Sequence, residues 1–193
     1  MSLGARGQLG KALVFFGWKG LDVVREYVIP ANPQTTAQNL QRGYLRTAVA
    51  AIHAAQGQAD HVLSETDIRS YALWASRVQA ATTWFNQAVR NFVDQLIAGK
   101  TPKLYTDGSS LPGATTLRTR VHDVSTHTTA GNFKYGTSKT ALINSIAADV
   151  AGNQISKIIP DLTAGVKYFW QFEPTTPVGL IGAKSGIYYG VAA

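Results

Sequence analysis

The strongest pattern in the chain is an apolar stripe in its first half that advances in alternating steps of three and four residues. The stripe consists of Ile68, Tyr71, Ala75, Val78, Thr82, Phe85, Val89, Phe92 and Leu96. This spacing predicts one amphipathic helix from residue 66 to residue 98, roughly 45–50 Å long. Trp74 and Trp84 lie off the stripe. Because a shorter helix and a hairpin cannot cover so long a face, we expect the β-rich half or another chain to cover the rest.

Two extended runs near the N-terminus predict a β-hairpin. Residues 11–16 and 21–29 are rich in Val, Phe, Ile and Tyr, and residues 17–20, which include Trp18, form a turn bounded by glycines. Arg25 and Tyr27 share one face of the second run. Since neither face is cleanly apolar, we expect each side of the hairpin to meet protein. The glycine-containing segment before residue 11 predicts a flexible N-terminal arm.

A first helix is predicted between the hairpin and the long helix. Pro30 ends the second strand, and Asn32 followed by Pro33 is typical of a helix start. Apolar residues at helical spacing then continue to about Gln56.

The chain changes character after residues 99–102, where Gly and Pro end the long helix and predict a domain boundary. Short alternating runs follow, separated by turn residues at the spacing of a β-sandwich. The predicted strands are 117–124, 132–136, 142–147, 154–159, 166–172 and 186–191. In the fifth of them Trp170 and Phe172 are expected to point inward and Gln171 outward. The predicted fold class is α+β, with a hairpin and two helices in residues 1–100 and a sandwich in 101–193.

Composition narrows the function classes. The 193 residues are 45% hydrophobic but only 15% charged, which favours surfaces that neighbours cover. The formal charge of +7 is spread without any run of like charges, so we do not expect nucleic acid as a partner. Cysteine is absent, which excludes disulfides and thiolate metal sites. The N-terminus lacks the apolar core of a signal peptide, and no segment is long enough to cross a membrane.

Candidate chemistry is sparse. His122, Asp123 and His127 form the only cluster among the four histidines, and their pattern is typical of solvent-exposed strand and turn residues. The glycines at 4, 7 and 10 with Lys11 do not match a phosphate loop, since the spacing is one residue too long and Ala12 replaces the required Ser or Thr. No nucleophile motif is present. We therefore expect no catalytic residues, no cofactor and no metal, and predict that the protein is not an enzyme.

The C-terminal half resembles fibronectin type III domains. Residues 162–168 match a signature in which Leu is followed by Pro-Gly-Thr and later by Tyr, except that Ala164 replaces the Pro and Val166 the Thr. Residues 132–138 and 185–189 are similar to two further strands of these domains. The resemblance covers about residues 103–193. It implies an immunoglobulin-like sandwich in which Tyr168 makes a tyrosine corner.

The N-terminal half resembles a group of small, mostly uncharacterised phage and prophage proteins. Their pattern is a Trp-Lys-Gly hairpin, an Arg-aromatic strand, an Asn-Pro-x-Thr helix start and a Gln-Arg step. The matching segments are 18–20, 24–30, 31–38, 41–42, 85–86 and 90–92. This resemblance implies a phage context and names no activity.

These features together predict a structural component of a bacteriophage particle, either a capsid decoration or minor capsid protein or a tail accessory protein. Its partners would be other virion proteins or copies of itself, and it would act in the virion after synthesis in the host cytoplasm. Large aromatic and charged side chains are the interface candidates. They are Trp18, Arg25, Tyr27, Trp74, Trp84, Tyr188 and Tyr189.

Two alternatives stay open at the level of sequence. A carbohydrate- or cell-surface-binding module would place exposed Trp or Tyr in a groove of the sandwich and bind a host-surface glycan. A hydrolase fragment or regulator would gather His122, Asp123 and His127 in one pocket.

Overall fold

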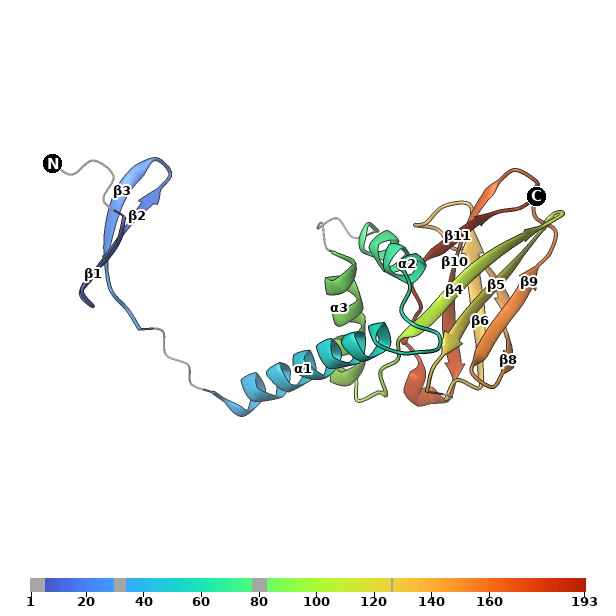
Figure 1. Ribbon diagram of the computed structural model, residues 1–193, viewed down its shortest axis with the longest axis horizontal. Coiled ribbons are helices and arrows are strands. Elements are labelled where there is room, and N and C mark those ends of the chain that lie inside the picture. Colours follow the sequence, from blue (N-terminus) through green and yellow to red (C-terminus); the bar gives the residue numbers. More distant parts are fainter. Residues whose placement is uncertain (1–5, 30–33, 78–82, 126) are drawn as a thin grey trace. The chain divides into compact units, whose positions relative to one another are not determined.

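The computed structural model describes residues 6–29, 34–77, 83–125 and 127–193. Within them the chain is α+β, with three α-helices and three antiparallel sheets of three or four strands (Figure 1). Contacts divide the chain into two compact units, residues 1–39 and residues 40–193, which are described separately. The division falls earlier than the boundary expected near residue 100, because the second and third helices belong to the same unit as the two larger sheets.

The first unit contains a three-stranded sheet, here called the hairpin sheet. Its strands are β1 (Gly7–Leu9), β2 (Leu13–Trp18) and β3 (Leu21–Glu26). The predicted hairpin is confirmed, but its turn has only two residues, Lys19 and Gly20, because Trp18 pairs with Leu21. Both turn residues have positive φ, 49° and 83°, which is the two-residue turn that matches strand twist. The predicted flexible arm is wrong for β1, which pairs with β2.

Helix α1 (Thr36–Gln56) begins after a capping box. The Thr35 hydroxyl accepts from the Gln38 backbone N–H at 3.3 Å, and the Gln38 side chain accepts from the Thr35 N–H at 3.4 Å. Asn32 and Pro33, the predicted start, lie outside the described residues. The helix ends at Gln56, as the sequence predicts.

The predicted long helix is wrong, because the apolar stripe belongs to two helices, α2 (Glu65–Ala75) and α3 (Trp84–Ile97). Helix α2 ends at a cap at Ser76, and Thr83 caps the start of α3 by accepting from the Asn86 N–H at 3.2 Å. The two helices pack against each other, and Tyr71, Phe85 and Val89 of the stripe share one cluster with residues of α1. Val78 and Thr82 lie outside the described residues.

Two four-stranded sheets complete the second unit. One has the order β4-β5-β9-β8 and the other β11-β10-β6-β7. Their bounds are β4 (Tyr105–Gly113), β5 (Thr116–Asp123), β6 (Ala130–Gly136), β7 (Asn144–Ala147), β8 (Asp149–Ala151), β9 (Gln154–Ile159), β10 (Lys167–Thr176) and β11 (Tyr188–Val191), with a short 3-10 helix, η1 (Val178–Leu180), before β11. All six predicted strands are present, and most of their boundaries differ from the predicted ones by a few residues. Strands β4 and β8 were not predicted. Side chains from both sheets form one buried cluster, to which Phe133 and Trp170 contribute from one sheet and Leu117 and Ile155 from the other.

Trp170 and Phe172 are buried in this cluster, as the alternation in β10 predicts. Gln171 was expected to point to solvent but is also buried, since its amide donates to the Ser185 carbonyl oxygen at 2.6 Å. The segment before β11 therefore covers the second face of β10.

A single buried carboxylate, that of Asp67, ties α2 to both sheets. Its oxygens accept from the Ser64 N–H and hydroxyl, both at 2.8 Å, and from the backbone N–H groups of Asp107 and Gly108 in β4, both at 2.9 Å. The Tyr188 hydroxyl of β11 also donates to it at 2.6 Å. Asp67 thus completes the capping box of α2 and accepts hydrogen bonds from two backbone N–H groups of β4.

We predict that Asp67→Asn lowers the free energy of unfolding by about 3 kcal/mol, because the amide removes the charge and points N–H groups at other donors. Urea denaturation of the purified chain measures this loss. Glu65→Gln is the matched control in the same helical turn, where the carboxylate is exposed, and should stay within about 0.5 kcal/mol of the wild type. Equal stability of the two variants would contradict the role assigned to Asp67.

Candidate functional site

A β-bulge in β4 positions the candidate site. The pairing of β4 with β5 shifts register between Thr106 and Ser109, which leaves Asp107 and Gly108 out of the ladder. Asp107 adopts a positive φ of 50°, and the Asp67 carboxylate holds the N–H groups of both bulge residues. Bulges re-aim side chains beside functional sites. Here the bulge brings the Asp107 carboxylate to two histidines.

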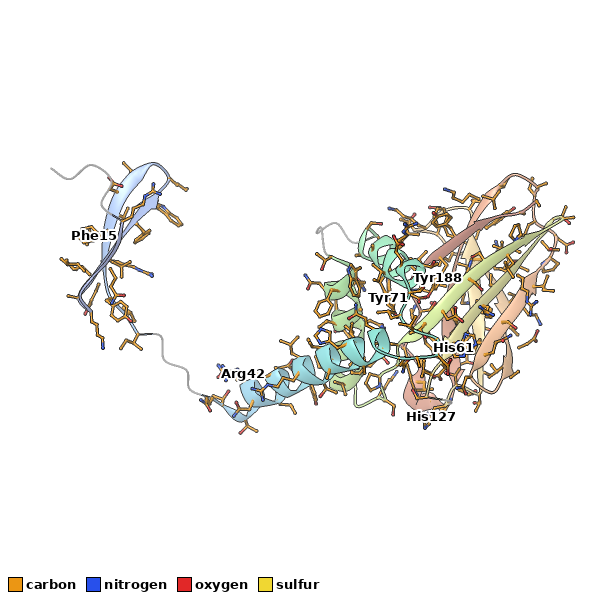
Figure 2. All side chains as sticks on the ribbon, in the orientation of Figure 1. Phe15, Arg42, His61, Tyr71, His127 and Tyr188 are labelled. Atoms are coloured by element: carbon orange, nitrogen blue, oxygen red, sulfur yellow. The ribbon has the colours of Figure 1, made fainter. Side chains whose placement is uncertain are left out.

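The three residues, His61, Asp107 and His122, are called the His–Asp–His cluster. Asp107 Oδ2 lies 3.2 Å from His61 Nδ1 and 3.1 Å from His122 Nδ1. The two imidazole rings stack in parallel, with centroids 3.6 Å apart and an angle of 14° between their planes. His61 comes from the connection between α1 and α2 (Figure 2), whereas His122 comes from β5.

Burial differs sharply within the cluster. The His61 and Asp107 side chains are 39% and 35% exposed, whereas that of His122 is 5% exposed. Burial lowers the pKa of His122, and the neighbouring His61 lowers it further, while Asp107 acts in the opposite direction. A neutral His122 keeps a lone pair, which can accept a hydrogen bond or bind a metal ion. Its Nδ1 is buried and has no hydrogen-bond partner within the described part of the chain, despite its distance of 3.1 Å from Asp107.

Arg120 supplies the fixed positive charge beside the cluster. Its Nη2 lies 3.3 Å from Asp107 Oδ2, so the carboxylate faces one guanidinium and two imidazoles. The site is partly open, since His61 and Asp107 reach solvent and His122 forms its inner side. Such a set of groups can bind a divalent cation between imidazole and carboxylate donors.

The pocket of His122, Asp123 and His127 that the hydrolase alternative requires is not the cluster that forms. His122 and Asp123 are adjacent in β5, so their side chains point to opposite faces of the sheet. Asp123 accepts from the Thr128 hydroxyl at 2.6 Å and lies 3.5 Å from the ammonium of Lys103, whose Nζ is also 3.2 Å from His127. The prediction of solvent exposure is correct for His127 and wrong for the buried His122 and Asp123.

Asp123 instead holds a loop in place. Burial raises the pKa of its carboxyl, but the hydrogen bonds from Thr128 and the charge of Lys103 lower it more, so the pKa lies below its ordinary value. A carboxylate that is ionised and fully paired in this way stabilises the segment after β5 and has no open position for a substrate.

The interface candidates have different surroundings. Trp18 is 60% exposed, Arg25 is exposed with its guanidinium 5.4 Å from the Phe16 ring centroid, and Tyr27 is half-buried. Trp74 and Trp84 pack against the buried cluster of the helices. Tyr188 is buried, with its ring against Gly108 and its hydroxyl hydrogen-bonded to Asp67. Tyr189 is 50% exposed, and the Lys167 ammonium lies 4.7 Å from its ring centroid.

The hairpin sheet is the second notable surface. Cross-strand pairing places Val14, Phe16, Trp18, Leu21 and Val23 on one face and Leu9, Leu13, Phe15 and Val24 on the other. Not one residue described between positions 6 and 29 is buried. Each face is therefore mostly apolar, interrupted by Gln8 and Arg25 on one face and by Asp22 and Glu26 on the other. Neither face is covered within the first unit, although a sheet of this size needs a buried face for stability.

No protein-family model matches the chain, and no curated protein matches it either. Among the described helices, none combines the length and the apolar character that a membrane span requires. The resemblances to fibronectin type III domains and to phage proteins therefore stay predictions.

We predict that Gly108→Ala destabilises the second unit by about 1–3 kcal/mol. A Cβ at this position would clash with the Tyr188 ring. The Tyr188 ring cannot move aside, since it stacks on Trp170 at 4.5 Å and its hydroxyl binds Asp67. Urea denaturation gives the loss.

Gly179→Ala is the control, because its Cβ would meet nothing closer than Thr101 Oγ1 at 3.9 Å. It should change the free energy of unfolding by less than about 0.5 kcal/mol. If Gly108→Ala were as stable as this control, the bulge would tolerate a side chain and the packing described here would be wrong.

Proposed function

We propose that this protein is a non-enzymatic structural component of a bacteriophage particle that acts through protein–protein contacts. The observation that carries the proposal is the hairpin sheet, which has large apolar side chains on both faces and buries none of its described residues. Trp18 and Leu21, directly paired across β2 and β3, are 60% and 68% exposed. Large exposed apolar surfaces are typical of protein-binding sites, and aromatic residues dominate binding energy at their centres.

The edges of the same sheet offer a second mode of contact. Strands β1 and β3 are the outer strands, so each has a row of backbone groups that no strand of the sheet pairs. A neighbouring chain can add a strand there, with main-chain hydrogen bonds for affinity and apolar side chains for specificity. The low share of charged residues, 15%, is consistent with a surface that other chains cover.

The proposal includes an immunoglobulin-like arrangement of the two larger sheets. It is supported by the cluster that both sheets share and by Tyr168, whose hydroxyl accepts from the Thr163 backbone N–H at 3.1 Å. This upstream hydrogen bond lowers the pKa of Tyr168 and is the contact that defines a tyrosine corner. Such sandwiches have many functions, so the phage context depends on the hairpin pattern and its resemblance.

The test uses phage particles purified from the source and two variants of the chain. We expect the wild-type protein in the particles at many copies by quantitative mass spectrometry. The double variant Trp18→Ser/Leu21→Ser should fall at least about tenfold in particle incorporation, because two central anchors are lost. The second unit should keep its denaturation midpoint.

Ile143→Ser is the matched control, since Ile143 is 83% exposed but lies in the second unit. It should be incorporated like the wild type. Normal incorporation of the double variant would reject the hairpin sheet as the docking surface. Absence of the wild-type protein from particles, together with a monomeric mass by light scattering, would reject the phage proposal.

A carbohydrate-binding module is the second candidate, and one cavity favours it. The cavity has a volume of about 370 Å³ and is lined by polar groups of α2 and β4 and by the half-exposed Tyr189. Aromatic faces flanked by hydroxyl and guanidinium groups suit sugar rings. The guanidinium here is that of Arg69.

On a glycan array, this candidate predicts binding by the wild-type protein and at least a tenfold loss in Tyr189→Ala. Val191→Ala, on the same strand but outside the cavity lining, should bind like the wild type. A wild-type protein that binds no glycan would eliminate this candidate and leave the phage proposal unaffected.

A further inference from the structure

We propose that His61, Asp107 and His122 bind one divalent transition-metal ion of the zinc class, a site that goes beyond the assembly role. One ligand atom from each residue lies within 4.8 Å of the other two. The residues are far apart in sequence and come from a connection, a bulge and a strand. Their convergence is therefore a product of the fold rather than of local sequence.

The distances suit a metal ion. Asp107 Oδ2 is 3.2 Å and 3.1 Å from the two imidazole Nδ1 atoms. Ligands of a tetrahedral zinc ion with bonds near 2.0–2.1 Å lie about 3.3 Å apart. An ion fits among the three atoms once a histidine ring rotates out of the stack, so that both Nδ1 lone pairs face it and the fourth position is open to water.

The second observation is the unsatisfied nitrogen of His122. This side chain is 5% exposed, and its buried Nδ1 lies 3.1 Å from Asp107 Oδ2 but makes no well-aligned hydrogen bond within the described residues. A buried polar atom without a partner destabilises the folded state, so native structures seldom keep one without a reason. A metal ion bound to this lone pair removes the cost.

The donor set selects the kind of ion. Two imidazoles and one carboxylate suit Zn²⁺ and neighbouring first-row ions, whereas Mg²⁺ and Ca²⁺ prefer oxygen ligands alone. Asp67 holds the backbone N–H groups of Asp107 and Gly108, which fixes the position of the carboxylate-bearing bulge. Arg120, 3.3 Å from Asp107 Oδ2, orients the carboxylate from outside the ligand set and lowers the affinity by its charge.

The bound ion would join the connection between α1 and α2 to the sheet that contains β4 and β5. His61 is the exposed ligand and has a positive φ of 54°, a conformation that Asn also tolerates. His61→Asn therefore removes the ligand without new backbone strain. Asp107 also has a positive φ, so Asp107→Asn likewise removes the carboxylate charge without new backbone strain.

The experiment is isothermal titration calorimetry of ZnCl₂ into the full chain, purified without a histidine tag. We expect one zinc ion per wild-type chain and a rise in the denaturation midpoint when zinc is added. His61→Asn and Asp107→Asn should each weaken zinc binding at least about tenfold. His127→Asn is the control, because it removes an exposed histidine outside the His–Asp–His cluster and leaves the proposed ligands intact.

Three results would overturn the proposal. The first is a wild-type chain that binds no stoichiometric zinc, and the second is a His61→Asn variant with wild-type affinity. The third is an equal loss in His61→Asn and His127→Asn, which would indicate adventitious binding by surface histidines. Circular dichroism checks that the variants fold. If Asp107→Asn does not fold, His61→Asn still decides the test, because His61 is exposed. None of these results depends on the phage proposal.

Discussion

The carboxylate of Asp67 is the interaction on which the second unit depends. It is buried and accepts five hydrogen bonds, from Ser64, from two N–H groups of β4 and from the Tyr188 hydroxyl. A buried charge is costly unless every lone pair is occupied, and here the partners come from a helix cap, a bulge and a distant strand. The position of α2 against the sheets follows from this requirement. So does the burial of Tyr188, whose pKa is raised by burial and by the nearby carboxylate.

The bulge that Asp67 holds creates the His–Asp–His cluster. In a regular strand successive side chains point to opposite faces of the sheet, and the Asp107 backbone would pair with β5. The extra residue instead releases Asp107 from the ladder and turns it toward His61 and His122. The same contact that stabilises the fold therefore also builds the one described place where imidazole and carboxylate donors meet. Stability and the proposed metal site are coupled at this point of the molecule.

The hairpin sheet follows a different principle. Its two-residue turn and cross-strand pairs specify the local structure, yet both of its faces have large apolar side chains and none of its described residues is buried. Local hydrogen bonding can define such a sheet, but hydrophobic burial must come from elsewhere. This division would suit the proposed assembly role, in which the surface that is incomplete in the chain would bind the partner.

The sequence by itself determined the elements whose signal is local. Alternation placed the core side chains Trp170 and Phe172, glycines at a turn placed the hairpin, and helical spacing ended α1 at Gln56. It failed at β4, whose Asp, Gly, Ser and Pro residues are typical of a loop. Strand β4 forms because β5 pairs with it, and as an edge strand it tolerates Pro112.

Only the tertiary structure decided the break between α2 and α3 and the membership of the candidate site. An apolar stripe has the same period whether the helix is continuous or folded back on itself, so periodicity could not reveal the cap at Thr83. His61, Asp107 and His122 have no characteristic spacing, and the neighbour of His122 in sequence, Asp123, points to the other face of the sheet. Long-range contacts set these features, because a carboxylate buried by folding must find its partners wherever the chain provides them.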